Sequence, residues 1–302
     1  MKNTLIMTVG IPGSGKTTWA EKFANERPAM KIYSSDKLRQ EMFDCTYTKE
    51  ENRALFAELH KRVRQDLAEG HSVIFDATNI SCKKRMAFLN EISDIQCDKI
   101  AAVMATPFTD CVQNDSKRGR HVGYDVICNM YKHWETPYHF EGWDAIWLLR
   151  DQNEKVLWPS EYLRYDQNNP HHDFTLGDHM SNTLKYVSEH LPMLKIKNNA
   201  LLDAAYFHDV GKPFCRVDKN NISHYPNHAN VGAYDALSLY GLSLEASALI
   251  TYHMAPLSWT HSKDPNKTRN KYKRLWGEEF FNNIMLLNEA DVKGGKKHED
   301  TI

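Results

Sequence analysis

Short apolar runs alternate with amphipathic segments along the first half of the chain. Five apolar runs have the length and flanking residues of buried strands, at Leu5–Val9, Ile32–Ser34, Val73–Phe75, Ile100–Ala105 and Ala145–Leu149. Segments with helical periodicity lie between them, at Thr17–Asn25, Glu50–Glu69, Lys83–Ile92 and Tyr124–Trp134. Strands separated by helices are typical of parallel sheets. The pattern therefore predicts an α/β domain over residues 1–150, with a parallel sheet flanked by helices.

The pattern changes after residue 150. Residues 151–170 contain prolines, several asparagines and little periodicity, which predicts a linker. Beyond it only helical patterns occur, at Leu176–Leu191, Ala200–His208, Ala229–Tyr240, Leu244–Met254 and Phe280–Asp291. Residues 171–302 are therefore expected to form an all-α domain.

Composition narrows the class of protein. A chain of 302 residues with 41% hydrophobic residues has the size and apolar content for about two domains. Its formal net charge of −1 means that any basic groove for nucleic acid must be local. The six cysteines include no Cys-x-x-Cys pair, which favours free thiols in a reducing compartment. Because no run approaches the roughly 20 apolar residues of a membrane span and no signal-peptide pattern opens the chain, we expect a cytoplasmic protein with no membrane partner.

The segment Gly10–Thr17 matches a phosphate-binding loop. It fits G-x-x-x-x-G-K-[ST] at every fixed position and lies between a predicted strand and a predicted helix. Its glycines let backbone N–H groups converge on phosphates at a helix N-terminus. Lys16 is expected to reach the β- and γ-phosphates of ATP, and Thr17 to help bind Mg²⁺. The predicted ATP-binding residues of the loop are Gly10, Gly13, Ser14, Gly15, Lys16, Thr17 and Thr18.

Charged residues that follow the later strands are candidates for the rest of a phosphoryl-transfer site. Asp76 ends the third strand and could orient Mg²⁺ or its waters, or simply cap the strand. Asp36 and Arg39 follow the second strand, where an aspartate could take a proton from a hydroxyl and an arginine could bind a phosphate. A surface helix pair is the alternative for these two residues. Residues 114–120 place three cations after a predicted helix, which suits either a lid or a solvated turn.

Together these features resemble the kinase domain of phage and bacterial 5′-hydroxyl polynucleotide kinases, over roughly residues 4–135. The matching segments are Gly10–Thr18, Ser35–Arg39, Asp76–Asn79 with Arg85 downstream, and Ser116–Gly119. The resemblance implies that Lys16 is catalytic, that Asp36 is the general base and that Arg118 is the lid arginine, which also binds ATP. It implies an acceptor site formed by Arg39, Asp76, Thr78, Asn79 and Arg85. Asn114 stands where the phage enzymes carry a further arginine, and Arg120 is the candidate that compensates as an ATP-binding residue.

Histidines are concentrated in the second half of the chain, where nine of fifteen lie between His171 and His261. His208 and Asp209 end an apolar helical segment. Such a segment would bury a metal site while leaving the side that carries the ligand atoms exposed. His179 lies upstream and Asp291 far downstream, each in another predicted helix. This order of ligands resembles the HD phosphohydrolase superfamily, in which these four residues would hold one metal ion.

The same resemblance implies roles for three further residues. His228 and His253 stand where binuclear HD proteins have ligands, which implies a second metal ion with Asp209 as the bridge. Lys212 could hold a phosphate oxygen beside the metals. Mixed histidine and aspartate ligation suits Mn, Ni, Co, Fe or Zn better than Mg. One or two such divalent ions are therefore expected in this domain, and ATP with Mg²⁺ in the first.

The two domains together, with the kinase first, resemble the bacterial HD-Pnk enzymes. Those enzymes phosphorylate 5′-hydroxyl ends and remove 2′- or 3′-phosphates, which implies end healing, with RNA repair as the setting and 2′,3′-cyclic phosphates as further substrates. The implied partners are ATP, single-stranded or nicked RNA or DNA ends, a ligase, and further copies of the chain in a homo-oligomer. One alternative is a small-molecule kinase fused to a nucleotide phosphohydrolase. Another is a nucleotide-gated sensor without turnover.

A basic segment, Lys263–Arg274, contains six Lys or Arg residues and one aspartate. Tyr272 lies within it, and Trp259 and Trp276 flank it. Cations for phosphates and aromatic rings for bases suit a single-stranded nucleic-acid end. A solvated charged loop is the favoured alternative.

Overall fold

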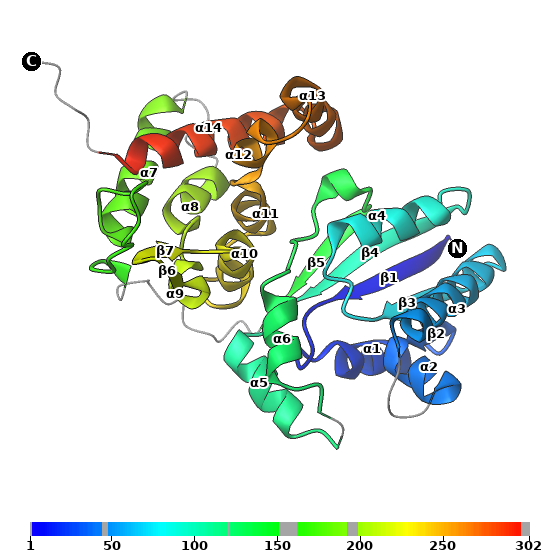
Figure 1. Cartoon of the computed structure of the whole chain (residues 1–302). Coiled ribbons are helices and arrows are strands. Elements are labelled where there is room, and N and C mark those ends of the chain that lie inside the picture. The colour runs from blue at the N-terminus through cyan, green and yellow to red at the C-terminus, as the bar shows by residue number, and fades with distance from the viewer. Residues whose placement is uncertain (1, 44–47, 120, 151–161, 192–198, 297–302) are drawn as a thin grey trace, which may run out of the picture. The chain divides into compact units, whose positions relative to one another are not determined.

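We describe the chain from a computed structural model, which defines residues 2–43, 48–119, 121–150, 162–191 and 199–296. The chain forms two compact units (Figure 1). The first contains Met1–Met130 and Pro137–Gln152, and the second contains Tyr131–Thr136 and Asn153–Ile302. Residues 151–161 of the predicted linker lie outside the described part of the chain.

The first unit is built on a five-stranded parallel sheet. Its strands are β1 (Asn3–Val9), β2 (Met30–Ser34), β3 (Ser72–Asp76), β4 (Cys97–Met104) and β5 (Ala145–Leu149). They pair in the order β2-β3-β1-β4-β5, and every neighbouring pair is parallel. Figure 1 shows the helices of this unit packed around the strands. The predicted parallel α/β fold is confirmed, and the strand order reverses beside β1, where such sheets bind ligands beyond the carboxyl ends of their strands.

Helices connect the strands of this unit. They are α1 (Lys16–Asn25), α2 (Ser35–Met42), α3 (Lys49–Ala68), α4 (Cys82–Glu91), α5 (Phe108–Ser116), α6 (Tyr124–Tyr131) and the 3₁₀ helix η1 (His139–Glu141). In α3, Thr48 and Glu51 form a capping box at the start, and Leu55 and Leu59 are fully buried at four-residue spacing. Periodicity does not predict α2, because its eight residues are mostly polar.

The second unit is mostly helical, as predicted. Its helices are α7 (Leu176–His190), α8 (Asn199–Phe207), α9 (Lys212–Cys215), α10 (His228–Ser238), α11 (Leu244–Tyr252), α12 (Ala255–Thr260), α13 (Pro265–Trp276) and α14 (Glu278–Gly294). The apolar helix α8 packs against α7, α11 and α14. Its C-terminal end therefore lies among the helices that carry the other predicted metal ligands. None of the described helices is both long and apolar enough to cross a membrane.

A hairpin interrupts the helices of the second unit. It consists of β6 (Val217–Lys219) and β7 (Ile222–His224), which pair antiparallel. The prediction of helical patterns only is wrong here, because strands of three residues are too short to show a period of two. Asn220 and Asn221 have positive φ angles of 53° and 59°, as a two-residue hairpin turn requires.

The basic segment Lys263–Arg274 lies mostly in helix α13, so the favoured charged loop is wrong in being a loop, but its cations are exposed as expected. The side chain of Asp264 caps the first turn of this helix. Trp259 and Trp276 are buried, and Tyr272 stacks on Trp259 with ring centroids 5.2 Å apart. The aromatic side chains are therefore used in packing, which removes the basis for the predicted base stacking and leaves only the exposed cations.

The short segment Tyr131–Thr136 packs within the second unit although it precedes β5 in the chain. Trp134 is fully buried, and its ring lies edge-on to Tyr234 at 5.0 Å. Thr136 Oγ1 lies 2.6 Å from Ser247 Oγ. The helix predicted to reach Trp134 accordingly ends at Tyr131, because the next residues take part in this packing.

Asp235 gives this packing a pH dependence. Its buried carboxyl group accepts a hydrogen bond from Tyr131 Oη at 2.5 Å. Burial raises the pKa of Asp235 to about 7, and the bond from Tyr131 opposes this only in part. The folded chain therefore keeps a proton that the unfolded chain loses near the ordinary pKa of 3.8. The stability contributed by this group falls as pH rises from about 4 to about 7.

We expect Asp235→Asn, which imitates the protonated form, to gain stability relative to the parent chain as pH rises over this range. Urea unfolding followed by circular dichroism at about pH 5 and about pH 8 measures the difference between the two chains. The same difference at both pH values would show that Asp235 does not titrate in this way.

Candidate active sites

The loop Gly10–Thr17 forms a phosphate cradle between β1 and α1. Gly13 and Gly15 have φ angles of 84° and 86°, which side chains rarely adopt. A Cβ on Gly13 would also lie 2.0 Å from the carbonyl oxygen of Cys111. Asn114 Nδ2 donates to Gly13 O at 3.0 Å, so this residue holds the loop from the side. The loop leads directly to the N-terminus of α1, as an anion site requires.

Lys16, Thr17 and Asp76 lie together at the end of this loop. Thr17 Oγ1 donates to Asp76 Oδ2 at 2.8 Å, and Asp76 is buried at the carboxyl end of β3. Lys16 Nζ donates to Ile11 O at 2.8 Å. Burial lowers the pKa of Lys16 to about 8, although Asp76 acts to raise it. A hydroxyl and a carboxylate in contact suit Mg²⁺ or its waters, so the geometry favours this role for Asp76 over acceptor binding.

A cavity of about 650 Å³ opens beside the loop. Residues predicted for ATP or acceptor binding line it, namely Lys16, Thr17, Asp36, Arg39, Asp76, Thr78 and Arg118. Asp36 is exposed in the first turn of α2, and Arg39 Nη1 donates to Asp36 Oδ1 at 2.7 Å. The fold therefore brings the expected base, acceptor arginine and lid arginine to one cavity with Lys16.

Arg85 is a correction to the predicted acceptor site. Its fully buried guanidinium donates to Glu141 from Nε at 2.7 Å and from Nη2 at 2.6 Å. A third bond, from Nη1, goes to Asn79 O at 2.9 Å. Asn79 in turn donates from Nδ2 to Thr8 O at 2.9 Å. Arg85 therefore holds the backbone of Asn79 in place inside the fold rather than reaching an acceptor.

Two other predicted ATP-binding residues, Thr18 and Arg120, have different outcomes. Thr18 is exposed on α1 and is not part of the cavity lining. Arg120 lies outside the described residues. Among the described residues, Arg118 is therefore the arginine of the predicted lid that reaches the cavity.

The cavity also contains residues that sequence reasoning missed. Its further polar lining comes from Ser35, Thr48, Lys49, Asn52, Arg53 and Lys84, and its apolar lining includes Phe56, Val122, Val126 and Met130. Lys49 and Arg53 lie near the start of α3, and Lys84 lies in the first turn of α4. Cations near a helix N-terminus are unfavourable beside the helix dipole. Their presence at these positions is the feature of the sequence that could have identified them as binding residues.

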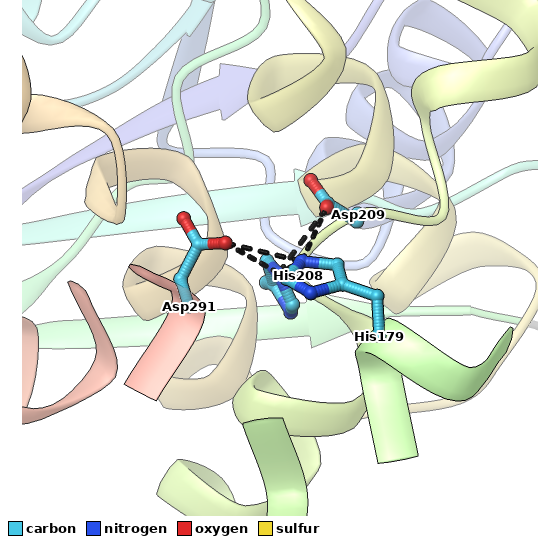
Figure 2. A group of neighbouring side chains, drawn as sticks. All are labelled: His179, His208, Asp209 and Asp291. Atoms are coloured by element: carbon cyan, nitrogen blue, oxygen red, sulfur yellow. Dashed lines mark hydrogen bonds and ion pairs between the residues drawn. The ribbon is translucent and has the colours of Figure 1, made fainter. Parts of the chain in front are cut away.

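Four predicted metal ligands converge in the second unit (Figure 2). His179 comes from α7, His208 and Asp209 directly follow α8, and Asp291 comes from α14. His179 Nε2 lies 3.1 Å from Asp209 Oδ2, from Asp291 Oδ1 and from His208 Nε2. Ligand atoms around one ion, with bonds of about 2.1 Å, lie about 3.0–3.4 Å apart. The spacing therefore fits a single divalent ion.

A second cluster shares Asp209. Its other oxygen, Oδ1, lies 3.1 Å from His228 Nε2 and 3.9 Å from His253 Nε2. The two histidine Nε2 atoms are 3.3 Å apart. His228 opens α10 and His253 follows α11. One carboxylate thus presents one oxygen to each cluster, which is the arrangement of a ligand that bridges two metal ions.

Backbone carbonyls orient three of these histidines. The Nδ1–H groups of His208, His228 and His253 each donate to the carbonyl three residues earlier, at 2.9, 2.7 and 2.7 Å respectively. Because a carbonyl can only accept, Nδ1 carries a proton, which leaves Nε2 as the nitrogen that faces the cluster. The ends of the helices therefore set both the tautomer and the direction of these ligands.

The charged groups of the first cluster act strongly on one another. Burial lowers the pKa of His208, but Asp209 and Asp291 outweigh it and raise this pKa to about 10. Burial would raise the pKa of Asp209, but Lys212 and His208 hold it well below its ordinary value. The pKa of His253 is lowered to about 3, first by burial. A divalent ion in the first cluster would therefore replace the imidazole proton as the partner of the carboxylates.

Lys212 lies against the bridging carboxylate. Its buried Nζ is 2.5 Å from Asp209 Oδ2, 2.7 Å from Gln167 Oε1 and 3.1 Å from His172 Nε2. Burial and then the charge of Lys212 lower the pKa of His172 to about 3, so a neutral ring accepts this bond. Gln167 belongs to the segment predicted as a linker, and no sequence motif signals its support of the site.

Two family models match the chain. Residues 5–136 match a model described as an AAA domain, and residues 176–293 match a model described as an HD domain. The first match covers the sheet and the phosphate loop, and the second covers both histidine–aspartate clusters. The chain therefore joins an α/β domain with a phosphate-binding loop, similar to AAA domains, to a helical domain similar to HD domains.

Individual relatives cover parts of the chain. L-seryl-tRNA(Sec) kinase from Methanococcus maripaludis is 25% identical over 161 residues, which are 50% of this chain and 60% of that protein. The chain thus spans less than two thirds of the length of this curated relative. A chain of the Pnkp1/Rnl/Hen1 RNA repair complex is 23% identical, with a TM-score of 0.41 over 44% of both chains. Kti12 of Chaetomium thermophilum, in complex with ADP-AlF3, is 20% identical, with a TM-score of 0.41 over 50% of this chain and 90% of that chain.

Proposed function

We propose that this chain heals nucleic-acid ends. Its kinase domain would transfer a phosphate from ATP to 5′-hydroxyl ends. Its HD domain would remove 2′- or 3′-phosphates, including 2′,3′-cyclic phosphates, with RNA repair as the setting. The observation that supports this best is that Lys16, Asp36, Arg39 and Arg118 line one and the same cavity, in a chain that also carries two metal-ligand clusters.

The chemistry of the two domains is complementary. Nucleolytic breaks in RNA leave a 5′-hydroxyl on one side and a cyclic, 2′- or 3′-phosphate on the other. Ligation needs the reverse polarity, so one chain would prepare both sides of a break. A ligase that seals the healed ends is the proposed partner, and a homo-oligomer is the proposed assembly.

In the kinase cavity, Asp36 would take the proton of the attacking 5′-hydroxyl as its oxygen bonds to the γ-phosphorus of ATP. The bond to the oxygen that bridges the β- and γ-phosphates breaks, and ADP leaves. Lys16 and the loop N–H groups neutralise the charge on the departing diphosphate. Arg39 holds a phosphate of the acceptor, and Arg118 stabilises the group in transfer.

In the HD domain, the two clusters would hold one or two divalent ions of Mn, Ni, Co, Fe or Zn. When bound, such ions supply an activated water and stabilise the oxygen that leaves phosphorus. The residues of this chain pre-set the ligand geometry: backbone carbonyls orient the histidines, and Lys212 holds Asp209.

The similarity to L-seryl-tRNA(Sec) kinase leaves a second candidate. This is a kinase for another hydroxyl acceptor, such as a nucleoside or other small molecule, fused to a nucleotide phosphohydrolase. The two candidates differ in the size of the acceptor that the cavity receives.

One substrate tests both halves of the proposal. An oligonucleotide with a 5′-hydroxyl and a 3′-phosphate is incubated with γ-labelled ATP, Mg²⁺ and each transition metal in turn. We expect label on the 5′ end and release of inorganic phosphate from the 3′ end. Transfer of label to nucleosides but to no oligonucleotide would overturn the proposal and favour the second candidate. RNA and DNA versions of the same sequence show which polymer is preferred.

Arg39→Ala should lower kcat/KM for a dinucleotide or a nucleoside 3′-monophosphate by roughly 10- to 100-fold, because a charged hydrogen bond to phosphate is worth roughly 1.5–3 kcal/mol. The effect on plain nucleosides should be far smaller. Loss of the 2.7 Å bond to Asp36 affects the phosphorylation of all of these acceptors equally. The ratio of kcat/KM between acceptors with and without a phosphate therefore isolates phosphate binding. Arg39→Lys keeps the charge without the planar fork and should give an intermediate ratio. An unchanged ratio would remove Arg39 from this role.

A further inference from the structure

The kinase cavity carries more positive charge than ATP and one acceptor phosphate would use. Its lining contains six cations, Lys16, Arg39, Lys49, Arg53, Lys84 and Arg118, and two carboxylates, Asp36 and Asp76. The proposed function employs Lys16 and Arg118 for ATP and Arg39 for one phosphate of the acceptor. Three cations of the same cavity therefore have no role in the reaction as described.

Helix stability does not account for two of these three cations. Lys49 is the first residue of α3, where Glu50 and Glu51 already provide the acidic groups that suit a first turn. The first turn of α4 contains Lys83 and Lys84 and no acidic residue. A cation in the first turn opposes the helix dipole, so a stable helix would have an acidic or neutral residue there.

Ion pairs distinguish the start of α3 from the rest of that helix. Further along α3, Arg62 pairs with Glu58 at 2.9 Å and Arg64 pairs with Asp94 at 2.6 Å. Within the described part of the chain, no ion pair at 4.0 Å or less involves the three unassigned cations. They face a cavity in which an anion from outside the chain would be their partner.

Asn52 connects these cations to the acceptor arginine. Arg39 Nη2 donates to Asn52 Oδ1 at 3.5 Å. Asn52 lies between Lys49 and Arg53 in the opening turns of α3, and all of them line the cavity. The start of α3 therefore lies beside the residue that would hold the first acceptor phosphate.

We propose that Lys49, Arg53 and Lys84 form a second phosphate subsite, which binds the next backbone phosphate of the acceptor strand. The inference rests on the proposed function, because it takes Asp36 and Arg39 to receive a 5′-hydroxyl nucleotide. A strand carries one phosphate per nucleotide, so a strand with its first phosphate on Arg39 offers the next to the neighbouring cations. The kinase thus selects acceptors with at least two phosphates over nucleosides, single nucleotides and other small hydroxyl compounds.

The test compares a dinucleotide with one internal phosphate and a trinucleotide with two. Both have 3′-hydroxyl ends, so the HD domain has no terminal phosphate to remove. The parent chain should phosphorylate the trinucleotide with a kcat/KM about tenfold higher or more. Arg53→Gln, Lys84→Gln and the double variant should lose about tenfold on the trinucleotide, mainly through KM, and keep the parent value on the dinucleotide.

Lys61→Gln is the matched control, because Lys61 is an exposed cation of the same helix that lies outside the cavity lining. This substitution should change kcat/KM for neither acceptor. An unchanged KM for ATP in every variant verifies that the cavity is folded. Equal losses on both acceptors, or no loss on either, would overturn the subsite and leave the kinase function standing. A parent chain that phosphorylates no 5′-hydroxyl oligonucleotide of any length would overturn the proposed function itself, and the subsite with it.

Discussion

Replacing Lys16 with alanine should reduce phosphoryl transfer by about 10³-fold or more, because it removes the loop's cation from the site where charge develops. Lys16 is buried in the loop, where its Nζ donates to Ile11 O at 2.8 Å. The release of 3′-phosphate should stay near the parent rate, because the metal ligands belong to the other unit. Both rates are measured on the same preparation, by label transfer from ATP and by release of inorganic phosphate.

Two further variants make this result specific. Asp36→Asn should also abolish transfer by removing the proton acceptor, but it should retain ATP binding, whereas Lys16→Ala should weaken it. Lys22→Ala changes an exposed lysine of the same helix and should leave both activities unchanged. Equal loss of kinase and phosphatase activity in a folded Lys16→Ala chain would show that the two sites are not independent.

Asp209→Ala should abolish phosphatase activity and disturb both metal ions, because its two oxygens face different clusters. His228→Ala and His253→Ala should each lower the metal content from about two ions per chain to about one and reduce 3′-phosphate release by about 100-fold or more, since a bound ion contributes several kcal/mol to the transition state. Elemental analysis of each purified variant, alongside the phosphatase rate, measures both effects. Kinase activity with Mg²⁺ should survive all three substitutions.

His224→Ala is the matched control for these histidine variants. His224 is exposed on β7, only four residues before His228, so it should change neither metal content nor activity. Full phosphatase activity in the His228 and His253 variants, with one metal ion per chain throughout, would leave a site with a single ion.

The phosphate loop and the adjacent pair His208 and Asp209 could be predicted because their signals are local. The positive φ angles at Gly13 and Gly15 and the start of α1 follow from consecutive residues, and they hold whatever surrounds the loop. His208 and Asp209 are adjacent at the end of an apolar helix, so burying that helix is enough to bring them into the core. The apolar runs determined the strands of the sheet in the same way, because a buried strand must be apolar over its own length.

The partners of long side chains were decided only by the tertiary structure. Arg85 has the place of an acceptor residue in the sequence, yet Glu141, far along the chain, takes its guanidinium. The division of the Asp209 carboxylate between two clusters depends on where five separate helices place the histidines and Asp291. Such contacts arise from packing between distant segments, and no period or spacing within one segment encodes them. The sequence by itself therefore determined which groups could react, and the packing determined which groups meet.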